Sequence, residues 1–228
     1  MTTVREPLER ERNPTRTREA ILDAAERLFA EKGFAGTSLN EIGVAAGVSR
    51  GTPGYFFGAK AELHRAVLER CLEQVRIAVR SGRERAIASH ESPEVVLAGA
   101  VGEYFDFITS RPNFVRLMEW EALSGGRQLR DVPPHLAAAR EAVAAIGLEL
   151  GLESAGPGAD EAAQLLLSII GLCWFPLVHS GTLLGALGID AATAEFREAR
   201  KRHVIDLVLH GLQGRIAATG ALQGEPRS

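Results

Sequence analysis

Cysteine is scarce in this sequence, which holds only Cys71 and Cys173 among 228 residues. The two lie far apart in apolar helical contexts, so they indicate neither a disulfide framework nor a zinc site. Also lacking are an H-E-x-x-H motif, a C-x-x-C pair, an E-x-x-H pair suited to a di-metal bundle and a phosphate-binding loop. The sequence therefore predicts no metal and no cofactor, and we expect no enzymatic activity.

Neither sign of charge dominates. The chain has 26 basic and 29 acidic residues, a net charge of −3, which argues against a generally basic coat for nucleic acid. Residues 1–60 hold 9 basic and 8 acidic residues, net +1, while the remainder holds 17 and 21, net −4. This asymmetry has the sign expected if the N-terminal part contacts a polyanion.

The first 19 residues lack an apolar core, which excludes a secretory signal. We expect residues 1–14 to form a flexible charged arm and the protein to be cytoplasmic.

Charge is also missing between Glu161 and Asp190, a span longer than the ~20 residues that cross a bilayer. Pro176 and Gly181 interrupt this span, and both of its flanks are acidic, whereas a cytoplasmic flank is normally basic. A membrane span is the alternative. We expect instead a helix that is buried on two sides, against its own core and against a partner subunit.

No alternating strand pattern and no internal repeat occur, so the expected class is all-α. Helical periodicity, Gly stops and Pro starts divide the chain into segments. A helix is expected over 17–31, followed by two short helices, one from 38 to 47 and one from 49. Longer helices are expected over 60–88, 93–110, 112–124, 134–151, 159–187 and 190–217.

Residues 39–57 have the pattern of a helix-turn-helix. Ser38 and Glu41 fit a capping box at the start of the first short helix. Gly43 is the small residue where two helices cross, and Gly47 is the turn. The shared apolar positions are Ile42, Ala46, Val48 and Phe56. Ser49 is expected to cap the second helix, whose start would enter the major groove of DNA.

The stretch TREAILDAAERLFAEKGFAGTSLNEIGVAAGVSRGTPGYFFGAKAEL resembles the N-terminal domain of the tetracycline-repressor-like (TetR/AcrR) transcriptional regulators. The resemblance implies three helices with a helix-turn-helix over 15–60, then a larger helical domain over 61–218 that binds a ligand and dimerises, with a loose tail over 219–228. It also implies a ligand-responsive repressor that binds a palindromic operator as a homodimer and is released by a small, largely apolar effector.

The resemblance implies roles for seven residues at the DNA. Thr37 and Ser38 would cap the first helix and contact phosphate, Ser49 and Thr52 would lie at the entrance of the recognition helix, and Lys60 would anchor a phosphate. Arg50 is the candidate for reading guanine, and Tyr55 would reach a phosphate or a thymine methyl group.

The sequence departs from the family pattern at Pro53 and Gly54, where leucine and tyrosine are common. If the helix began at Ser49, Pro53 would stand about four residues inside it. Gly54 would cost roughly 1 kcal/mol relative to alanine. We therefore expect a recognition helix that is short and weakly formed until DNA docks.

The resemblance places the sensing and dimerising residues in the second domain. Glu119, Arg116 or His179 could supply a polar group to orient the effector. The expected pocket lining is Tyr104, Phe105, Phe114, Leu117, Met118, Trp120, Trp174, Phe175 and His179. The expected dimer interface is Leu166, Ile169, Ile170 and Trp174 on one helix with Val204, Ile205, Val208, Leu209 and Leu212 on the other.

Two other functions remain open at this point. A helical bundle could serve as a protein-interaction module, or it could bind a small molecule without any activity on DNA. The expected partners are double-stranded DNA, an effector and a second copy of the chain, with no membrane.

Overall fold

The computed structural model describes residues 14–130, 132–152 and 156–223, with no side chain described from Leu212 onward. Within these ranges the chain is helical and has no strand, as the all-α prediction requires. The expected arm falls almost wholly outside the described residues. The elements are α1 (Pro14–Lys32), α2 (Leu39–Ala45), α3 (Thr52–Phe57), α4 (Lys60–Ala88), α5 (Pro93–Ser110), α6 (Pro112–Leu123), α7 (Pro133–Glu149), α8 (Pro157–Val178), η1 (Ser180–Leu184) and α9 (Ala194–Gln223).

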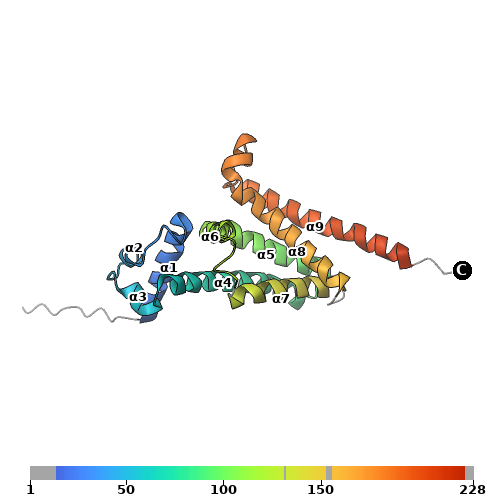
Figure 1. The fold of residues 1–228 in the computed structure, drawn as a ribbon. Coiled ribbons are helices and arrows are strands. Elements are labelled where there is room, and N and C mark those ends of the chain that lie inside the picture. Colours follow the sequence, from blue (N-terminus) through green and yellow to red (C-terminus); the bar gives the residue numbers. More distant parts are fainter. Residues whose placement is uncertain (1–13, 131, 153–155, 224–228) are drawn as a thin grey trace, which may run out of the picture.

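The first three helices form a small unit at one end of the molecule, and the C-terminal end of α9 lies at the other (Figure 1). The apolar face predicted for α1 is buried along its whole length, from Ile21 to Phe29. It packs against Ile42 of α2 and against Leu63 and Val67 at the start of α4. Helix α4 thus belongs to both parts of the molecule, because its first turns complete the core of the small unit.

Helix α4 then continues into the larger part, where α5 packs closely along it (Figure 1). A Cβ atom on Gly82 of α4 would lie 2.9 Å from the backbone oxygen of Gly99 on α5. Only glycine allows two helix backbones to approach this closely. The remaining helices α6 to α9 complete the body around this pair.

The helix expected over 159–187 ends earlier, at Val178. A single π-helical turn, η1, follows, and it projects from the body between α8 and α9 (Figure 1). Pro176 lies in the last turn of α8, where its missing N–H removes one helical hydrogen bond. Helix α9 runs to Gln223, past the expected domain end at residue 218.

Helix α8 is long and apolar enough to cross a membrane by length and composition alone. In the structure it packs against α7 and α9 and buries Ile169 and Cys173. Its apolar side chains Leu167, Phe175 and Val178 are exposed, so a second apolar face is left uncovered within one chain.

Candidate nucleic-acid interface and effector cavity

The start of α2 has the predicted capping box. The Ser38 hydroxyl accepts from the Glu41 backbone N–H at 3.2 Å, and the Glu41 carboxylate accepts from the Ser38 backbone N–H at 2.9 Å. Hydrogen bonds from Ser38, and then the ammonium group of Lys32 at 3.2 Å, lower the pKa of the Glu41 carboxyl. The helix that carries the motif therefore has a defined first turn, with Ser38 exposed.

The turn between α2 and α3 also follows the prediction. Gly47 has a φ of +68°, a conformation that favours glycine. Gly43 is buried at the crossing, where an added Cβ atom would lie 2.9 Å from the Ser49 backbone oxygen and 3.1 Å from the Cα of Arg50. A side chain at position 43 would push the start of the second helix away.

The expected cap on the second helix is wrong. Helix α3 begins at Thr52 rather than after Ser49, and its N-cap residue, Gly51, makes no side-chain cap bond. The Ser49 hydroxyl instead lies 2.6 Å from the Thr52 hydroxyl oxygen. Pro53 is consequently in the first turn, where a backbone N–H has no helical partner and a φ near −65° is already helical. Pro53 is fully buried and starts α3 rather than interrupting it.

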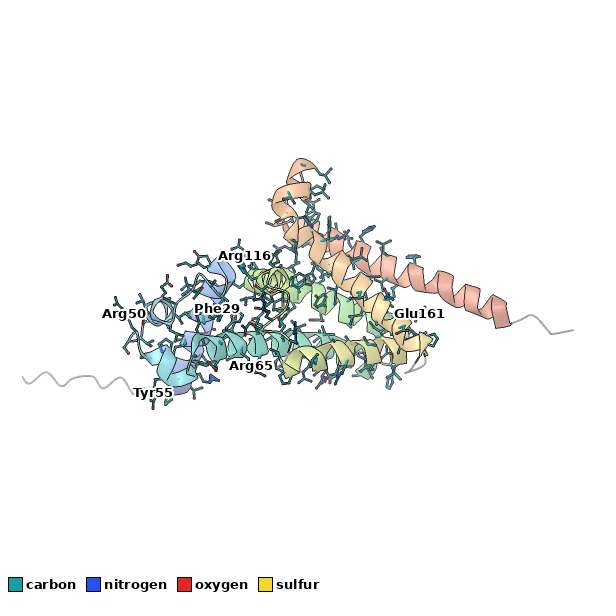
Figure 2. All side chains as sticks on the ribbon, viewed as in Figure 1. Phe29, Arg50, Tyr55, Arg65, Arg116 and Glu161 are labelled. Carbon is teal, nitrogen blue, oxygen red and sulfur yellow. The ribbon has the colours of Figure 1, made fainter. Side chains whose placement is uncertain are left out.

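Three of the predicted DNA contacts are exposed around this short helix. Ser49 and Arg50 lie in the turn before α3, and Tyr55 has 86% of its surface exposed, an unusual state for a large aromatic side chain. Figure 2 shows Arg50 and Tyr55 at the outer end of the small unit. Thr52 is half-buried. Exposed Val44 of α2 adds an apolar group that the sequence had not singled out.

Thr37 and Lys60 point inward, and their predicted phosphate contacts do not fit this geometry. The Thr37 side chain is 3% exposed, and its hydroxyl donates to the backbone oxygens of Leu28 and Gly33. The Lys60 ammonium donates to the backbone oxygens of Phe34 at 2.9 Å and Thr37 at 3.0 Å, and lies 4.3 Å from the centre of the Phe34 ring. Both residues hold the 33–37 loop against α1 and α4.

A cavity of about 510 Å³ lies among α4, α5, α6, α7 and α8. Tyr104, Phe114, Met118 and Trp174 line it, as predicted for a sensing pocket. The Trp174 indole N–H donates to the Tyr104 hydroxyl oxygen, and the Trp174 and Phe114 rings meet edge to face at 5.9 Å. Burial raises the pKa of the Tyr104 phenol.

The other five predicted pocket residues lie elsewhere. Phe105 and Leu117 are buried in the core without reaching the cavity. Trp120 donates its indole N–H to the Ala30 backbone oxygen of α1 at 3.3 Å. The Phe175 and His179 rings lie in tilted contact, with centroids 4.4 Å apart, and neither residue lines the cavity. Aromatic residues at helical spacing can therefore belong to the core or to contacts between helices as well as to a pocket.

None of the three polar groups proposed to orient an effector, Arg116, Glu119 and His179, is among the residues that line the cavity. Charged side chains from α4 and α7 line one edge instead. Arg76 and Arg80 reach Glu141 at 3.1 and 3.0 Å, and Arg83 reaches Glu149 at 2.8 Å. The spacing of the arginines at i, i+4 and i+7 puts them on one helix face, a signal present in the sequence.

The predicted dimer residues on α8 face their own chain. Leu166, Ile169, Ile170 and Trp174 line the cavity; Ile169 is buried and the other three are half-buried. The apolar residues Leu167, Phe175 and Val178 of this helix do not line the cavity and are exposed. A helix that is apolar all round has no polar face to indicate its orientation, so the sequence could not show which of its residues line the cavity.

On α9 the predicted interface is mixed. Val204 and Val208 are buried within the chain, Ile205 and Leu209 are half-buried, and the side chain of Leu212 lies outside the described residues. Leu207, which was not predicted, is an exposed apolar residue of this helix.

A buried pair of titratable groups joins α4 to α6 beside the small unit. His64 Nε2 lies 3.8 Å from Glu121 Oε1, and both side chains are buried. Burial, with a smaller effect from the positive charge of Lys60, lowers the pKa of His64 to about 4. Burial also raises the pKa of Glu121, whose carboxylate accepts from the Gln128 backbone N–H at 3.2 Å.

Comparison with known proteins agrees with this geometry. Residues 21–67 match the family model for bacterial regulatory proteins of the tetR family, and residues 93–208 match that for the tetracyclin repressor-like C-terminal domain. The chain is 28% identical over 202 residues to the HTH-type transcriptional repressor NicS of Pseudomonas putida, covering 87% of this chain and 93% of that protein. It is 26% identical over 204 residues to the HTH-type transcriptional repressor SCO4008 of Streptomyces coelicolor, covering 86% and 98%.

A solved structure has the same fold. NalD, the secondary repressor of the MexAB-OprM multidrug efflux pump in Pseudomonas aeruginosa, is similar with a TM-score of 0.62 and 22% identity, over 87% of this chain and 98% of that one. These relatives are transcriptional regulators rather than enzymes. The chain, with an exposed helix-turn-helix at one end and a helical body that encloses a cavity, belongs to the tetR family of ligand-responsive, DNA-binding transcriptional regulators.

Proposed function

We propose that the chain is a cytoplasmic repressor, without catalytic activity, that binds a palindromic operator as a homodimer and leaves it when a small effector enters the cavity. The observation that carries this proposal is the exposed group of Ser49, Arg50 and Tyr55 on a capped and tightly turned helix pair. The similar proteins NicS and SCO4008, both named as repressors, support the direction of the effect.

The exposed residues of the motif fall into two groups, those suited to contact bases and those suited to contact phosphates. Arg50 is exposed next to α3, and a guanidinium can donate to guanine O6 and N7 together in the major groove. The hydroxyls of Ser38, Ser49 and Thr52 and the phenol of Tyr55 are suited to phosphate oxygens, which fix position rather than sequence. Base reading would therefore depend mainly on Arg50.

Dimerisation would use the uncovered apolar face of α8, with Leu167, Phe175 and Val178, together with Leu207 of α9. Contiguous exposed apolar residues on a soluble protein are suited to a protein interface. A two-fold pair would present α3 twice, and dimers of this kind read half-sites about 34–36 Å apart or at a related spacing.

Coupling between the cavity and the motif would pass through α6. Phe114 and Met118 of this helix line the cavity, while Trp120 and Glu121 contact the small unit and α4. An effector that displaces α6 or α4 would move the two recognition helices apart or together. The resulting loss of operator affinity is typically ~1–3 kcal/mol in such coupled systems.

Selection of duplexes from a random library by the purified full-length chain tests the proposal. We expect an enriched palindrome, a dimer in solution, and an affinity that falls steeply with salt while the sequence preference persists. A monomer that enriches no duplex would refute the proposal. If such a chain still bound apolar compounds in its cavity, it would be a small-molecule-binding protein without activity on DNA.

A further inference from the structure

The chemistry of the cavity lining narrows the class of molecule that it can hold. Most of the lining is aliphatic or aromatic, contributed by residues such as Leu72, Val101, Phe114 and Ile169. The polar side chains among the lining residues fall into two groups. One is the Tyr104–Trp174 pair, and the other is the arginine and glutamate edge of α4 and α7.

The Tyr104–Trp174 pair offers a single unused donor. An indole N–H can only donate, so the Tyr104 oxygen is the acceptor in this hydrogen bond. Among the residues that the structure describes, no acceptor takes the hydroxyl proton of Tyr104. Because burial raises the pKa of the phenol, Tyr104 keeps that proton at neutral pH. An acceptor oxygen on a bound molecule would pair with this donor, which is half-buried and lies among the cavity-lining residues.

The charged edge is already balanced within the chain. Arg76 pairs with Glu73 and Glu141, Arg80 with Glu141, and Arg83 with Glu149. Three guanidinium groups therefore face three carboxylates. A charged ligand that displaced one partner of the Arg83–Glu149 pair, whose side chains are 27% and 13% exposed, would leave the other charge uncompensated at a cost. A neutral ligand leaves all of them intact.

We propose that the effector is a neutral, largely apolar molecule with one acceptor oxygen, such as a carbonyl or ether, which accepts the hydrogen bond of the Tyr104 hydroxyl. Trp174 orients that hydroxyl by donating to its oxygen. This inference rests on the proposed function, in which the cavity is the effector site.

The test uses Trp120→Phe as background, because Trp174 is then the single tryptophan of the chain and its fluorescence reports binding. Three probes are titrated into the full-length protein. Benzylacetone carries a carbonyl, butylbenzene is a hydrocarbon of similar shape, and hydrocinnamate is an anion of similar size. The same titrations follow after Tyr104→Phe is added, which removes one hydroxyl and retains the ring.

We expect Tyr104→Phe to weaken benzylacetone binding about fivefold, the usual effect of one hydrogen bond, and to leave butylbenzene binding unchanged within about twofold. Unchanged butylbenzene binding also shows that the cavity remains folded. Hydrocinnamate should bind more weakly than benzylacetone in the Trp120→Phe background. Equal effects of Tyr104→Phe on the two neutral probes, tighter binding of the anion, or no binding of any probe would each overturn the proposal.

Duplex selection with the wild-type protein separates this inference from the proposed function. An enriched palindrome together with any of the three overturning results rejects the effector class alone. The expected probe pattern without an enriched duplex rejects the repressor function and leaves the chemistry of the cavity standing.

Discussion

The indole N–H of Trp120 donates to the backbone oxygen of Ala30 at 3.3 Å, which joins α6 directly to the last turn of α1. The Trp120 ring also covers Gly33, where an added Cβ atom would lie 3.0 Å from ring carbon Cδ2. Gly33 has a φ of +69° and ends α1. One tryptophan thus ties the helical body to the end of the first helix of the DNA-binding unit.

Substitution of Gly33 should destabilise the protein through this contact. Gly33→Ala and Gly47→Ala both place a Cβ at a left-handed position, which costs roughly 1–2 kcal/mol. Gly47 has nothing within 4 Å of its Cβ position, so it is a matched control for strain alone. We expect urea unfolding to show a larger loss of stability for Gly33→Ala than for Gly47→Ala. In a Trp120→Ala background we expect this difference to disappear. Equal losses at the two glycines would contradict the role given to Trp120.

The crossing of α2 and α3 should be sensitive to one methyl group. Gly43→Ala would press on the Ser49 backbone oxygen and displace α3, so we expect operator affinity to fall by about tenfold or more, as for a loss of ~1.4 kcal/mol. Gly54→Ala is the control, because its Cβ would meet only Leu39 Cδ1 at 3.9 Å. Helix propensity then favours alanine by roughly 1 kcal/mol, and affinity should hold or rise. A gel shift on the selected operator measures both, and the idea fails if the two variants bind alike.

Arg50 should determine preference at one base position. Arg50→Ala is expected to cost ~1–3 kcal/mol on the selected operator and to relax the preference at a single position. Lys60→Ala is the comparison, because the Lys60 ammonium is bonded within the chain and its loss should lower stability more than sequence preference. Binding titrations across operators with single base changes distinguish the two. If Arg50→Ala weakened binding equally to every operator variant, Arg50 would contact phosphates rather than a base.

The His64–Glu121 pair should make stability depend on pH. The folded-state pKa of His64, about 4, lies below its ordinary value of 6.5, so the unfolded chain binds a proton that the folded chain does not between these values. The contribution of His64 to the free energy of unfolding is therefore present above pH 6.5 and is lost as pH falls toward 4. Wild type should lose about 2 kcal/mol relative to His64→Gln between about pH 7 and pH 5.

Comparing the two proteins isolates His64, because the neighbouring groups remain in both. The raised pKa of Glu121 acts in the opposite direction, adding stability as pH falls. Denaturant unfolding at several pH values gives the measurement, and stability curves that run parallel for wild type and His64→Gln would contradict it.

The uncovered face of α8 should control assembly. Leu167→Glu places a charge on the face that we assign to the partner, and we expect a monomer with operator affinity reduced by at least an order of magnitude. Leu148→Glu is the control, since Leu148 of α7 is 71% exposed and Leu167 is 61% exposed. Light scattering on the purified variants reports the mass. A dimer that survives Leu167→Glu would place the interface elsewhere.

Local patterns predicted most of the DNA-binding unit. The capping box of Ser38 and Glu41, the turn at Gly47 and the buried face of α1 each depend on residues a few positions apart, and each is present in the structure. The start of α3 was misplaced because Ser49 is a good capping residue by type. The stronger constraint was Pro53, which is best tolerated in the first turn of a helix.

Orientation could not be predicted in the same way. Thr37 and Lys60 turn inward because of carbonyl groups brought near them by the folded loop, and sequence spacing carries no information on this. For a similar reason, the sequence could not show which apolar residues of α8 line the cavity and which are exposed. The arginines of α4 were passed over because their partners, Glu141 and Glu149, lie more than sixty positions along the chain.

The proline at the head of α3 has a consequence for how the protein searches DNA. A ring that fixes one backbone angle, buried against the preceding helix, reduces the number of shapes the segment samples in free solution. Less conformational entropy is then lost when α3 binds in the major groove. A helix of only six residues can therefore bind DNA without having to fold on it first. Each encounter with DNA can be brief, because α3 already has its helical conformation when it meets the groove.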